Sequence, residues 1–471
     1  MNMLTFSFDG LQLKDQIPLL GNSNNEKNII DNDYDFNDFL ILKHKNYAGF
    51  ALRDKKAKTN TLFAQEIDNG GKLAGSMKKL SNILSESRRR LGAFDIYPSE
   101  DSTKILIVNN PPFDKYANEK FGFKIFDENL KELSNLEVTF PYKDKNFSVA
   151  DYILAKDGVI YMLARIEIPR DKKEKGEADY YCEIISVNAN GKGEVTEYEV
   201  KLPQKYITDV SFRVLDKDIV CSGFYNNIET RGASHDEING IFYLKIDKKT
   251  KTISAKGVKD LDKEFVADLT TKRKANKGRG ISNNFELTDF IKKDNGGAIL
   301  VAEESYMYVT QTCNTNGQCT YVYHYVRGNI IAINVEPTGN IKWYVNIPKH
   351  QSTVNDYAIY SSYMLAVVKD KIYFVYNDNP KNMDPGAKSD KLKAMTNPRG
   401  ALAVLVTLSE NAKVEKKTLF SNKENKMTLM PSKNVKISKT EFIAPAVNRG
   451  IYCCMIPFKK GKYNLLRFDF K

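Results

Sequence analysis

The sequence predicts an all-β protein. Short runs rich in Val, Ile, Tyr and Phe recur along the chain and are bounded by turns of Gly, Asn, Asp or Lys, a pattern typical of strands. The 26 Tyr and 25 Phe residues favour pleated, half-buried surfaces. Helical periodicity is limited to about Met77–Leu91, and this stretch also fits a strand followed by a loop. The clearest strand runs begin at Phe39, Lys104, Val159, Asp218, Ala298, Lys371 and Phe442.

These strands recur in one local format. A polar segment ends in a tight turn, and an apolar strand follows, at seven places about 56 to 78 residues apart, slightly above the spacing of common propeller repeats. The copies are centred on Lys45, Asp101, Asp157, Lys217, Asn295, Asp370 and Lys439, the first being the weakest. Hairpin patterns follow, beginning at Phe121, Cys182, Ile241, Asn329 and Leu402. Each repeat then supplies four antiparallel strands, which make one blade, so we expect a β-propeller of about seven blades.

The two chain ends fit the same scheme. Met1–Pro18 alternates apolar and polar residues around a turn at Asp9-Gly10, which is a hairpin pattern, whereas Tyr463–Phe470 supplies one further strand. We therefore expect residues 1–18 to complete the last blade with residues 426–471. The pairing would close a single domain over residues 1–471 and remove exposed sheet edges.

The charge of the protein gives little information about its partners. The formal net charge is +12, but 71 Lys and Arg residues are interspersed with 59 Asp and Glu residues. The densest basic stretches are Arg88–Arg90, Lys55–Lys58 and Lys272–Arg279, and we expect solvated loops there, with contact to a polyanion as the alternative. No aromatic residue interleaves Lys272–Arg279, so nucleic acid is not favoured as a partner.

No stretch approaches the roughly 20 apolar residues of a membrane-spanning helix, so none is expected. The opening residues lack the basic and apolar regions of an export signal. Either the protein is cytoplasmic, or Met1 is not its natural start.

The six cysteines point to one candidate bridge. Cys182, Cys221, Cys453 and Cys454 lie in apolar strand-like runs and are expected to behave as small hydrophobic residues. Cys313 and Cys319 instead flank a polar Asn-Thr-Asn-Gly tip, where they could face each other across a hairpin. A disulfide and two free thiols are the two interpretations, while a zinc site lacks a second pair of ligands.

Several segments resemble known propellers. Asn329–Pro348 resembles the repeat of pyrroloquinoline-quinone-type propellers, with Gly339 in the turn and Trp343 in the outer strand. The segment SEDSTKILIV around Asp101 resembles the strand turn of WD40-like and TolB-type propellers. A longer combination of segments, beginning at Asn118, Asp151, Gly328 and Lys371, looks like a group of uncharacterised and mostly exported Bacteroidota proteins. That resemblance implies a periplasmic or cell-surface location and no particular activity.

Motifs for catalysis or cofactors are weak. Cys453-Cys454 is similar to the adjacent-cysteine disulfide of quinoprotein dehydrogenases, but this sequence has one Trp where those enzymes repeat it. Asp31, Asp33 and Asp35 are spaced as in half a calcium loop that lacks its Gly and closing Glu. The four histidines, His44, His235, His324 and His350, form no local metal pair, and no nucleophile elbow or Walker loop is present. We therefore expect no metal and no cofactor.

The sequence favours a non-enzymatic binding or scaffold module. Its long loops would contact a protein or glycan partner, the longest being Arg170–Tyr180, Thr271–Asn284 and Asn379–Pro398. The alternative is a hydrolase or lyase that acts on a glycan or peptide in the propeller channel through acidic and Tyr residues. A third interpretation, polyanion binding by basic loops, predicts affinity that falls steeply with salt.

Overall fold

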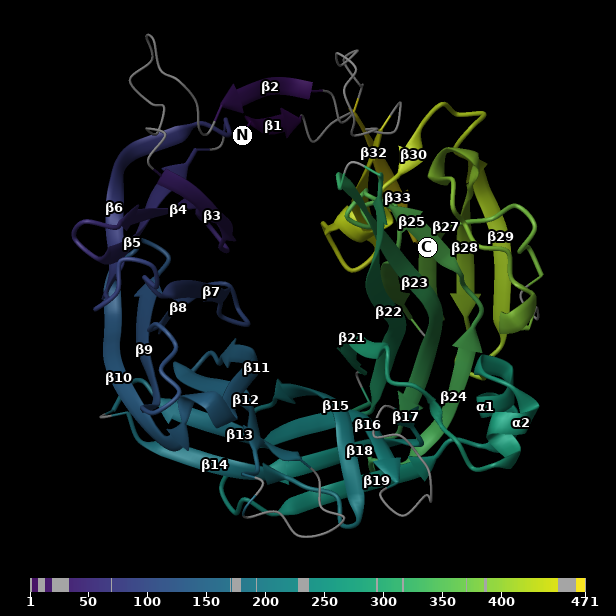
Figure 1. Ribbon diagram of the computed structural model, residues 1–471, viewed down its shortest axis with the longest axis horizontal. Coiled ribbons are helices and arrows are strands. Elements are labelled where there is room, and N and C mark those ends of the chain that lie inside the picture. The colour runs from purple at the N-terminus through teal and green to yellow at the C-terminus, as the bar shows by residue number, and fades with distance from the viewer. Residues whose placement is uncertain are drawn as a thin grey trace. The chain divides into compact units, whose positions relative to one another are not determined.

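The computed structural model shows an almost wholly β protein (Figure 1). It describes residues 2–6, 13–18, 34–68, 70–169, 171, 179–191, 193–227, 237–293, 295–315, 317–369, 371–384, 388–447 and 463–470. Two compact units divide the chain: the first comprises Met1–Lys201 and Arg213–Asp218, and the second comprises Leu202–Phe212 and Ile219–Lys471. The single domain over residues 1–471 stays a prediction.

The first unit consists of a hairpin and three four-stranded antiparallel sheets, which follow one another along the chain. The hairpin pairs β1 (Asn2–Phe6) with β2 (Leu13–Pro18). The first sheet contains β3 (Tyr34–Ile41), β4 (Asn46–Asp54), β5 (Thr59–Ile67) and β6 (Leu73–Leu84). The second contains β7 (Ala93–Pro98), β8 (Lys104–Asn110), β9 (Asn118–Asp127) and β10 (Glu132–Lys143), followed by the short helix η1 (Asp144–Asn146). The third contains β11 (Phe147–Leu154), β12 (Val159–Glu167), β13 (Tyr180–Asn188) and β14 (Val195–Val200).

The next two sheets continue the order. One contains β15 (Lys205–Val214), β16 (Asp218–Asn227), β18 (Gly240–Asp247) and β19 (Ile253–Asp260). A small sheet pairs β17 (Glu237–Ile238) with β20 (Ile281–Ser282), and the helices α1 (Lys263–Leu269) and α2 (Lys272–Asn276) precede β20. A five-stranded sheet contains β21 (Phe285–Lys292), β22 (Ala298–Cys313), β23 (Cys319–Val335), β24 (Ile341–Ile347) and β25 (Gln351–Val354).

Two further sheets follow in the C-terminal part of the second unit. One contains β26 (Met364–Val368), β27 (Lys371–Asp378), β28 (Leu402–Leu408) and β29 (Val414–Ser421), with the short helices η2 (Ser389–Lys391) and η3 (Pro398–Gly400) between β27 and β28. The other contains β30 (Thr428–Leu429), β31 (Val435–Lys436), β32 (Glu441–Val447) and β33 (Tyr463–Asp469), with η4 (Pro431–Lys433). Within the described residues, sheets of four or five strands thus occur seven times in succession. Their membership of one ring of blades stays a prediction.

Burial follows the position of a strand in its sheet. The central strands are buried almost throughout, as in β12 and β16, whereas outer strands such as β29 are largely exposed. Within the first unit, the buried side chains of the sheets β7–β10 and β11–β14 form one apolar cluster. Within the second, the sheets β21–β24 and β26–β29 do the same. Neighbouring sheets therefore bury their apolar faces against each other, which explains why the strand segments of the sequence are rich in apolar residues.

The predicted turn format is present between β11 and β12. Gly158 has a φ of +84°, which residues with a Cβ adopt less readily, and its N–H donates to the carbonyl of Ala155 over 3.0 Å. The Ala155 N–H in turn donates to the carbonyl of Val159, also over 3.0 Å. The Asp-Gly signal thus correctly located a hairpin.

The region of helical periodicity, Met77–Leu91, is a strand and its loop, since β6 ends at Leu84. In contrast, the prediction that Lys272–Arg279 is a loop is wrong for its first half, which is α2. The Thr271 side chain accepts a hydrogen bond from the N–H of Lys274, and Asp262 caps α1 in the same way. These N-terminal caps explain the two short helices.

The predicted pairing of the chain ends is not confirmed. Residues 2–6 and 13–18 pair as two antiparallel strands, as expected for a hairpin, but in the described residues β1 and β2 pair only with each other. The strand β33 pairs with β32, in the register Glu441 opposite Asp469. No helix in the described part of the chain is long and apolar enough to cross a membrane.

Candidate functional site

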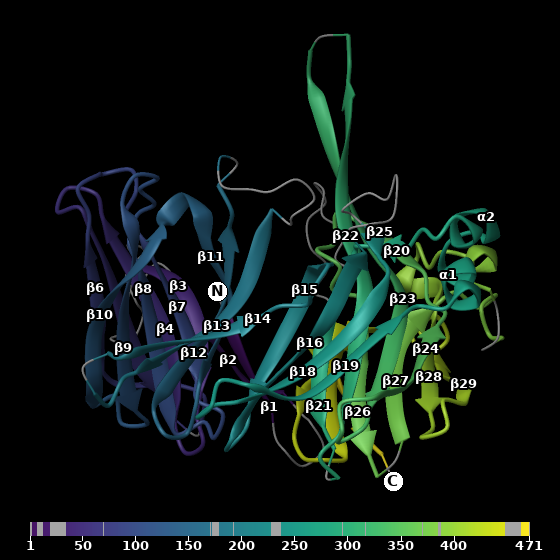
Figure 2. The same cartoon turned by 90° about the horizontal axis from the view of Figure 1, so that it is seen from below.

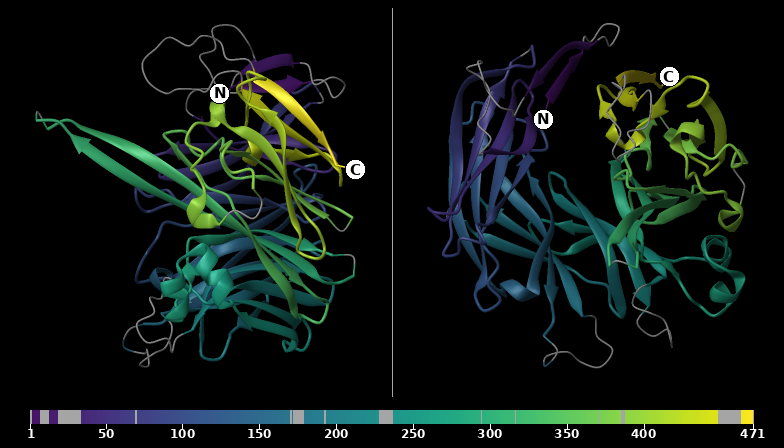
Figure 3. Two further views of the ribbon diagram at one scale, coloured as in Figure 1. Left: turned by 90° about the vertical axis from the view of Figure 1, so that its right-hand side faces the viewer. Right: turned by 45° about the horizontal axis from the view of Figure 1, so that its top comes forward.

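The most prominent feature of the second unit is a long hairpin that we call the arm, defined as Ser305–Val326. It is formed by the outer halves of β22 and β23, which are 16 and 17 residues long and exceed the usual length of strands. The strand β21 pairs with β22 only up to Glu304, and β24 pairs with β23 only from Ile330. The arm therefore extends beyond the other strands of its sheet (Figure 2; Figure 3, left).

The arm differs from the rest of the chain in composition. Asp, Glu, Lys and Arg make up 28% of the protein, yet none occurs between Ser305 and Val326. Its exposed large hydrophobic residues are Tyr306, Met307, Tyr308, Val309, Tyr321 and Tyr323. Four of them, Met307, Val309, Tyr321 and Tyr323, lie on one face of the hairpin, and exposed apolar residues gathered in this way mark a site of interaction.

The arm presents these residues on two faces. Cross-strand partners lie on the same face, so Met307 and Tyr325, Val309 and Tyr323, and Gln311 and Tyr321 form one row.

On the opposite face, the rings of Tyr308 and His324 are stacked with their centroids 4.4 Å apart. The Oγ1 atom of Thr310 lies 2.9 Å from Nε2 of His324. His324 is thus held by its neighbours on the arm, as expected for a structural residue rather than a base.

Both edges of the arm are open over part of their length. In the described residues, Tyr306–Cys313 pairs with β23 alone, because β21 does not reach past Glu304 and the last bond on that side runs from the Ser305 N–H to the carbonyl of Asn284 over 2.8 Å. On the other side, β25 covers the part of β23 from His324 to Arg327, and no second strand of the described part of the chain pairs with Cys319–Val322. An open edge offers unpaired backbone N–H and C=O groups to another strand.

The tip of the arm carries the predicted cysteine pair. Cys313 and Cys319 are directly opposite in the register and are joined by a disulfide, with S–S at 2.05 Å and Cα atoms 4.0 Å apart. Their redox state in the cell stays a prediction. The backbone N–H of Gln318 donates to Oδ1 of Asn314 over 2.9 Å, which tightens the turn.

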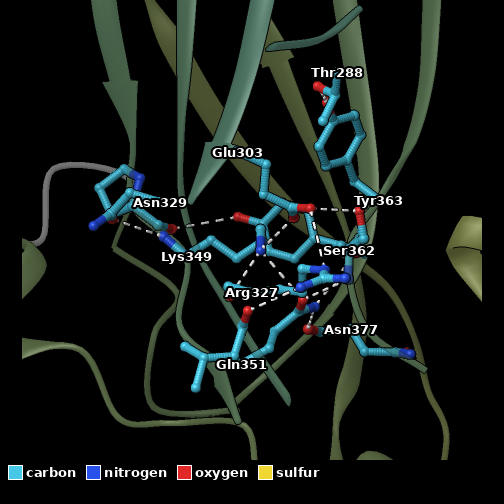
Figure 4. A network of polar contacts seen from close by, with 12 residues as sticks. Thr288, Glu303, Arg327, Asn329, Lys349, Gln351, Ser362, Tyr363 and Asn377 are labelled. Atoms are coloured by element: carbon cyan, nitrogen blue, oxygen red, sulfur yellow. Dashed lines mark hydrogen bonds and ion pairs between the residues drawn. The ribbon is translucent and has the colours of Figure 1, made fainter. Parts of the chain in front are cut away.

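A buried polar network lies at the base of the arm (Figure 4). Lys349 is fully buried, and its Nζ atom lies 2.8 Å from Oε1 of Glu303, which is also buried. The same ammonium group donates to the carbonyl of Arg327 over 2.9 Å and to Oε1 of Gln351 over 3.2 Å. Glu303 and Arg327 belong to the two strands of the hairpin, so the network ties both of them to the segment before β25.

The network continues into the neighbouring sheet. The hydroxyl of Ser362 donates to Oε2 of Glu303 over 2.7 Å, and its backbone N–H donates to Oε1 of Gln351 over 2.7 Å. The Nε2 atom of Gln351 donates to the carbonyl of Asn377 over 2.8 Å. Burial lowers the pKa of Lys349, while the nearby Glu303 opposes this shift. The charged ammonium is stabilised by the carboxylates of Glu303 and Asp378 and by its hydrogen-bond acceptors, which fixes the geometry of the base of the arm.

Other residues considered from the sequence are not gathered at one site. His44 lies 2.8 Å from a carboxylate oxygen of Glu128, and burial lowers the pKa of His350. The described residues contain no cluster of three or more His, Cys, Asp or Glu side chains suited to a metal. Cys453, Cys454, His235, Asp31 and Asp33 lie outside the described residues.

Of the three predicted long loops, Thr271–Asn284 contains α2 and β20, and the described part of Asn379–Pro398 is held by hydrogen bonds. Asn382 donates to Oδ1 of Asp378 over 2.9 Å and to the carbonyl of Lys393 over 2.7 Å. The buried carboxylate of Asp378 also pairs with Lys416. These bonds fasten the loop to its own sheet.

One carboxylate pair in the first unit bears on the hydrolase alternative. The Tyr142 hydroxyl lies 3.2 Å from Oε2 of Glu183 and 3.1 Å from Oε1 of Glu197. Burial, and then the charge of Glu197, raises the pKa of Glu183 to about 7. A protein hydroxyl bridges the two carboxyl groups, so the arrangement supports packing between strands rather than attack on a substrate.

Comparisons with known proteins found similar solved structures but no family and no curated relative. No protein-family model and no curated protein matches the sequence. Similar solved structures include hydrazine synthase of Kuenenia stuttgartiensis, at 11% identity over 75% of this chain and 74% of that one, with a TM-score of 0.34. The β-propeller domain of the Trilobed protease from Pyrococcus furiosus is similar at 12% identity over 80% and 81% of the two chains, with a TM-score of 0.32. The WD40 domain of SCAP from fission yeast is similar at 8% identity over 93% and 95%, with a TM-score of 0.29.

Proposed function

We propose that this protein is a non-enzymatic binding module that captures a partner protein through the arm, by accepting a strand of the partner at an open edge. The observation that carries this proposal is the edge Tyr306–Cys313, which has a neighbouring strand on one side only within the described residues. It is eight residues of extended backbone without a charged residue or a proline.

Such an edge needs a partner. Natural sheets protect long exposed edges with charges, prolines or bulges, because an open edge otherwise pairs with other chains. The arm has neither charged residues nor prolines. Strand addition satisfies the backbone groups and lets alternate side chains, such as Met307 and Val309, select the partner.

We infer that the partner is a protein because the arm presents the unpaired backbone groups of a strand edge. Backbone N–H and C=O groups pair with another peptide chain, and the aliphatic side chains of Met307 and Val309 gain from burial against apolar side chains. The absence of charge on the arm favours an uncharged partner strand, since a charged one would lose hydration without gaining an ion pair.

The base of the arm supports this role. Lys349, Glu303 and Arg327 hold the two strands where they leave the sheet, and the disulfide joins them at the tip. Ordering of the hairpin is therefore largely complete before binding, which reduces the entropy lost on association. A disulfide also persists in oxidising compartments, so we propose a location outside the cytoplasm, in the cell envelope.

Site-specific photocrosslinking tests the proposal. The photoreactive residue p-benzoylphenylalanine would replace Met307 or Tyr321, which are 53% and 52% exposed, in the cells that produce the protein. The matched control is Leu133, which is 50% exposed and lies on β10. We expect one discrete adduct from the two arm positions, none from the control, and loss of the adduct when Val309→Lys blocks the edge. An adduct that survives Val309→Lys, or the absence of a discrete adduct from both arm positions, would contradict the proposal.

A further inference from the structure

One face of the arm is apolar, in addition to the open edge. We call this surface the tyrosine face and define it as Met307, Val309, Tyr321, Tyr323 and Tyr325. Its three tyrosines recur at every second position of β23, which brings their rings to the same side of the hairpin. The other two residues, Tyr321 and Tyr323 are 43–53% exposed, so the described part of the chain leaves most of this face open to solvent.

The tyrosine face continues beyond the arm, onto the loop that follows β25. The ring centroid of Tyr357 lies 6.2 Å from that of Tyr325. Tyr357 is 82% exposed, more than any other large hydrophobic residue in the described part of the chain. Tyrosine is enriched among the residues that anchor protein interfaces, so a ring this open beside an apolar face marks a contact.

Hydrogen bonds fix the loop on both sides of Tyr357. The Oδ1 atom of Asp356 accepts a bond from the hydroxyl of Thr353 over 2.7 Å and one from the backbone N–H of Ala358 over 2.9 Å. These bonds set the backbone immediately before and after Tyr357. The ring is therefore presented by a shaped loop, which reduces the entropy lost when it is buried in a complex.

The same loop is bonded to the arm. The backbone N–H of Asn355 donates to the carbonyl of Tyr323 over 2.9 Å, and its Oδ1 accepts from the N–H of Tyr323, also over 2.9 Å. Asn355, Tyr357 and Ala358 have φ values of +52°, +54° and +57°, which are uncommon for residues with a side chain. Strained backbone of this kind persists where its surroundings impose it, and it gathers at binding sites.

A strand added at the open edge does not account for Tyr357. Neighbouring strands lie about 5 Å apart, so a strand paired with Tyr306–Cys313 would lie about 10 Å from β23. Tyr357 follows β25, which pairs with the opposite side of β23. The two strands of the arm and one added strand would also form a single layer with an open apolar face, and such a layer is normally buried against a second one.

We propose that the partner is a folded protein that adds one strand to the open edge and covers the tyrosine face with a second, apolar segment anchored on Tyr357. This inference rests on the proposed function and deepens it, because it distinguishes a folded partner from a lone extended peptide. The arm has no charged residue, so a charged covering segment would lose hydration without gaining an ion pair there.

Photocrosslinking at Tyr357 tests the proposal in the cells that produce the protein. The residue p-benzoylphenylalanine would replace Tyr357 or Met307, with Val354 as the matched control. Val354 is 51% exposed and lies three residues before Tyr357, but it is opposite His324 in the register and therefore on the other face of the arm. We expect the same partner in the adducts from Tyr357 and Met307, attached through two different segments of its chain, and no adduct from Val354.

The other outcomes separate this proposal from the proposed function. An adduct from Met307 without one from Tyr357, or attachment of both through the same short segment, would overturn the second contact and leave the edge contact standing. An adduct of equal yield from Val354 would also overturn the assignment to the tyrosine face. An adduct from Tyr357 alone, or from neither position, would contradict the edge contact and, with it, this extension.

The variant Tyr357→Asn measures the contribution of the ring. Asn adopts a left-handed backbone readily, so the loop should keep its shape and the melting temperature should match that of the unaltered protein. We expect the amount of partner that co-purifies to fall at least about fivefold, as for an aromatic anchor of an interface. The control Tyr116→Asn removes a ring that is 75% exposed on the first unit and should retain the partner. Full retention by Tyr357→Asn, or an equal loss in Tyr116→Asn, would contradict the proposal.

Discussion

Lys349 and Glu303 form an ion pair of 2.8 Å whose two side chains are both buried at the base of the arm. Removing Lys349 leaves the buried Glu303 carboxylate with Arg327, 3.8 Å away, as its opposing charge, so Lys349→Met should reduce the free energy of unfolding by about 3 kcal/mol, the lower end for a broken buried pair. The double variant Lys349→Met/Glu303→Leu should recover much of that loss, because no charge is left buried. Urea denaturation of the three proteins measures both effects.

An exposed ion pair supplies the control for this prediction. Lys413 and Glu415 lie 2.7 Å apart, and their side chains remain 68% and 64% exposed. Lys413→Met should leave the urea midpoint nearly unchanged, since solvent screens such pairs. Equal destabilisation by Lys413→Met and Lys349→Met would show that burial of the Lys349 pair has no special effect.

The stability of the first unit should depend on the charge of Glu183. Burial, and then Glu197, raises its pKa in the folded protein to about 7, whereas the ordinary value is 4.5. The folded state therefore binds this proton more tightly, and the contribution of Glu183 to stability falls as the pH rises from about 4.5 to about 7. Glu183→Gln should raise the melting temperature at pH 8 and leave it nearly unchanged at pH 4. The exposed Glu167→Gln is the control, and a gain that is equal at both pH values would refute this account.

The disulfide gives a prediction about the cell. Trypsin releases Asp294–Arg327 as one peptide, which contains Cys313 and Cys319 and no other cysteine. After purification from an oxidising compartment, this peptide should be two hydrogen atoms lighter than its reduced form and should resist alkylation. Alkylation of both cysteines without prior reduction would rule out the bridge.

The ends of the chain allow a test of ring closure. If residues 1–18 complete the last blade, deleting Met1–Pro18 should lower the melting temperature and promote aggregation, because the edge of β33 would lose its neighbour. A truncated protein that stays soluble with unchanged thermal stability would show that the closure hypothesis is wrong.

Local patterns predicted the local structure well. The Asp-Gly pair at Asp157 predicted the turn between β11 and β12. The polar tip between Cys313 and Cys319 predicted a hairpin, and both are present. Both signals depend on a few adjacent residues, and so does the alternation that predicts strands. The short helices were missed because their caps, Asp262 and Thr271, act within segments too short to show helical periodicity.

The site depends on contacts between distant parts of the chain, which one sequence does not show. Lys349 is one of many lysines in the sequence, and its burial follows from the position of Glu303 on another strand. The projection of the arm likewise follows from where the pairing with β21 and β24 ends, at Glu304 of β22 and Ile330 of β23. The available signal was the absence of charged residues from Ser305 to Val326, and it becomes informative once those edges are known to be open.

Shortening the arm tests the central claim most directly. Deleting Val309–Tyr323 and joining Tyr308 to His324 through an Asn-Gly turn keeps the stacked pair of Tyr308 and His324 and the pairing with β25. The size and composition of the native complex would be compared for the full and shortened chains purified from the producing cells. We expect the shortened protein to keep its melting temperature within a few degrees and to elute without the partner that the full chain retains. A shortened protein that still carries the same partner in the same amount would contradict the assignment of binding to the arm.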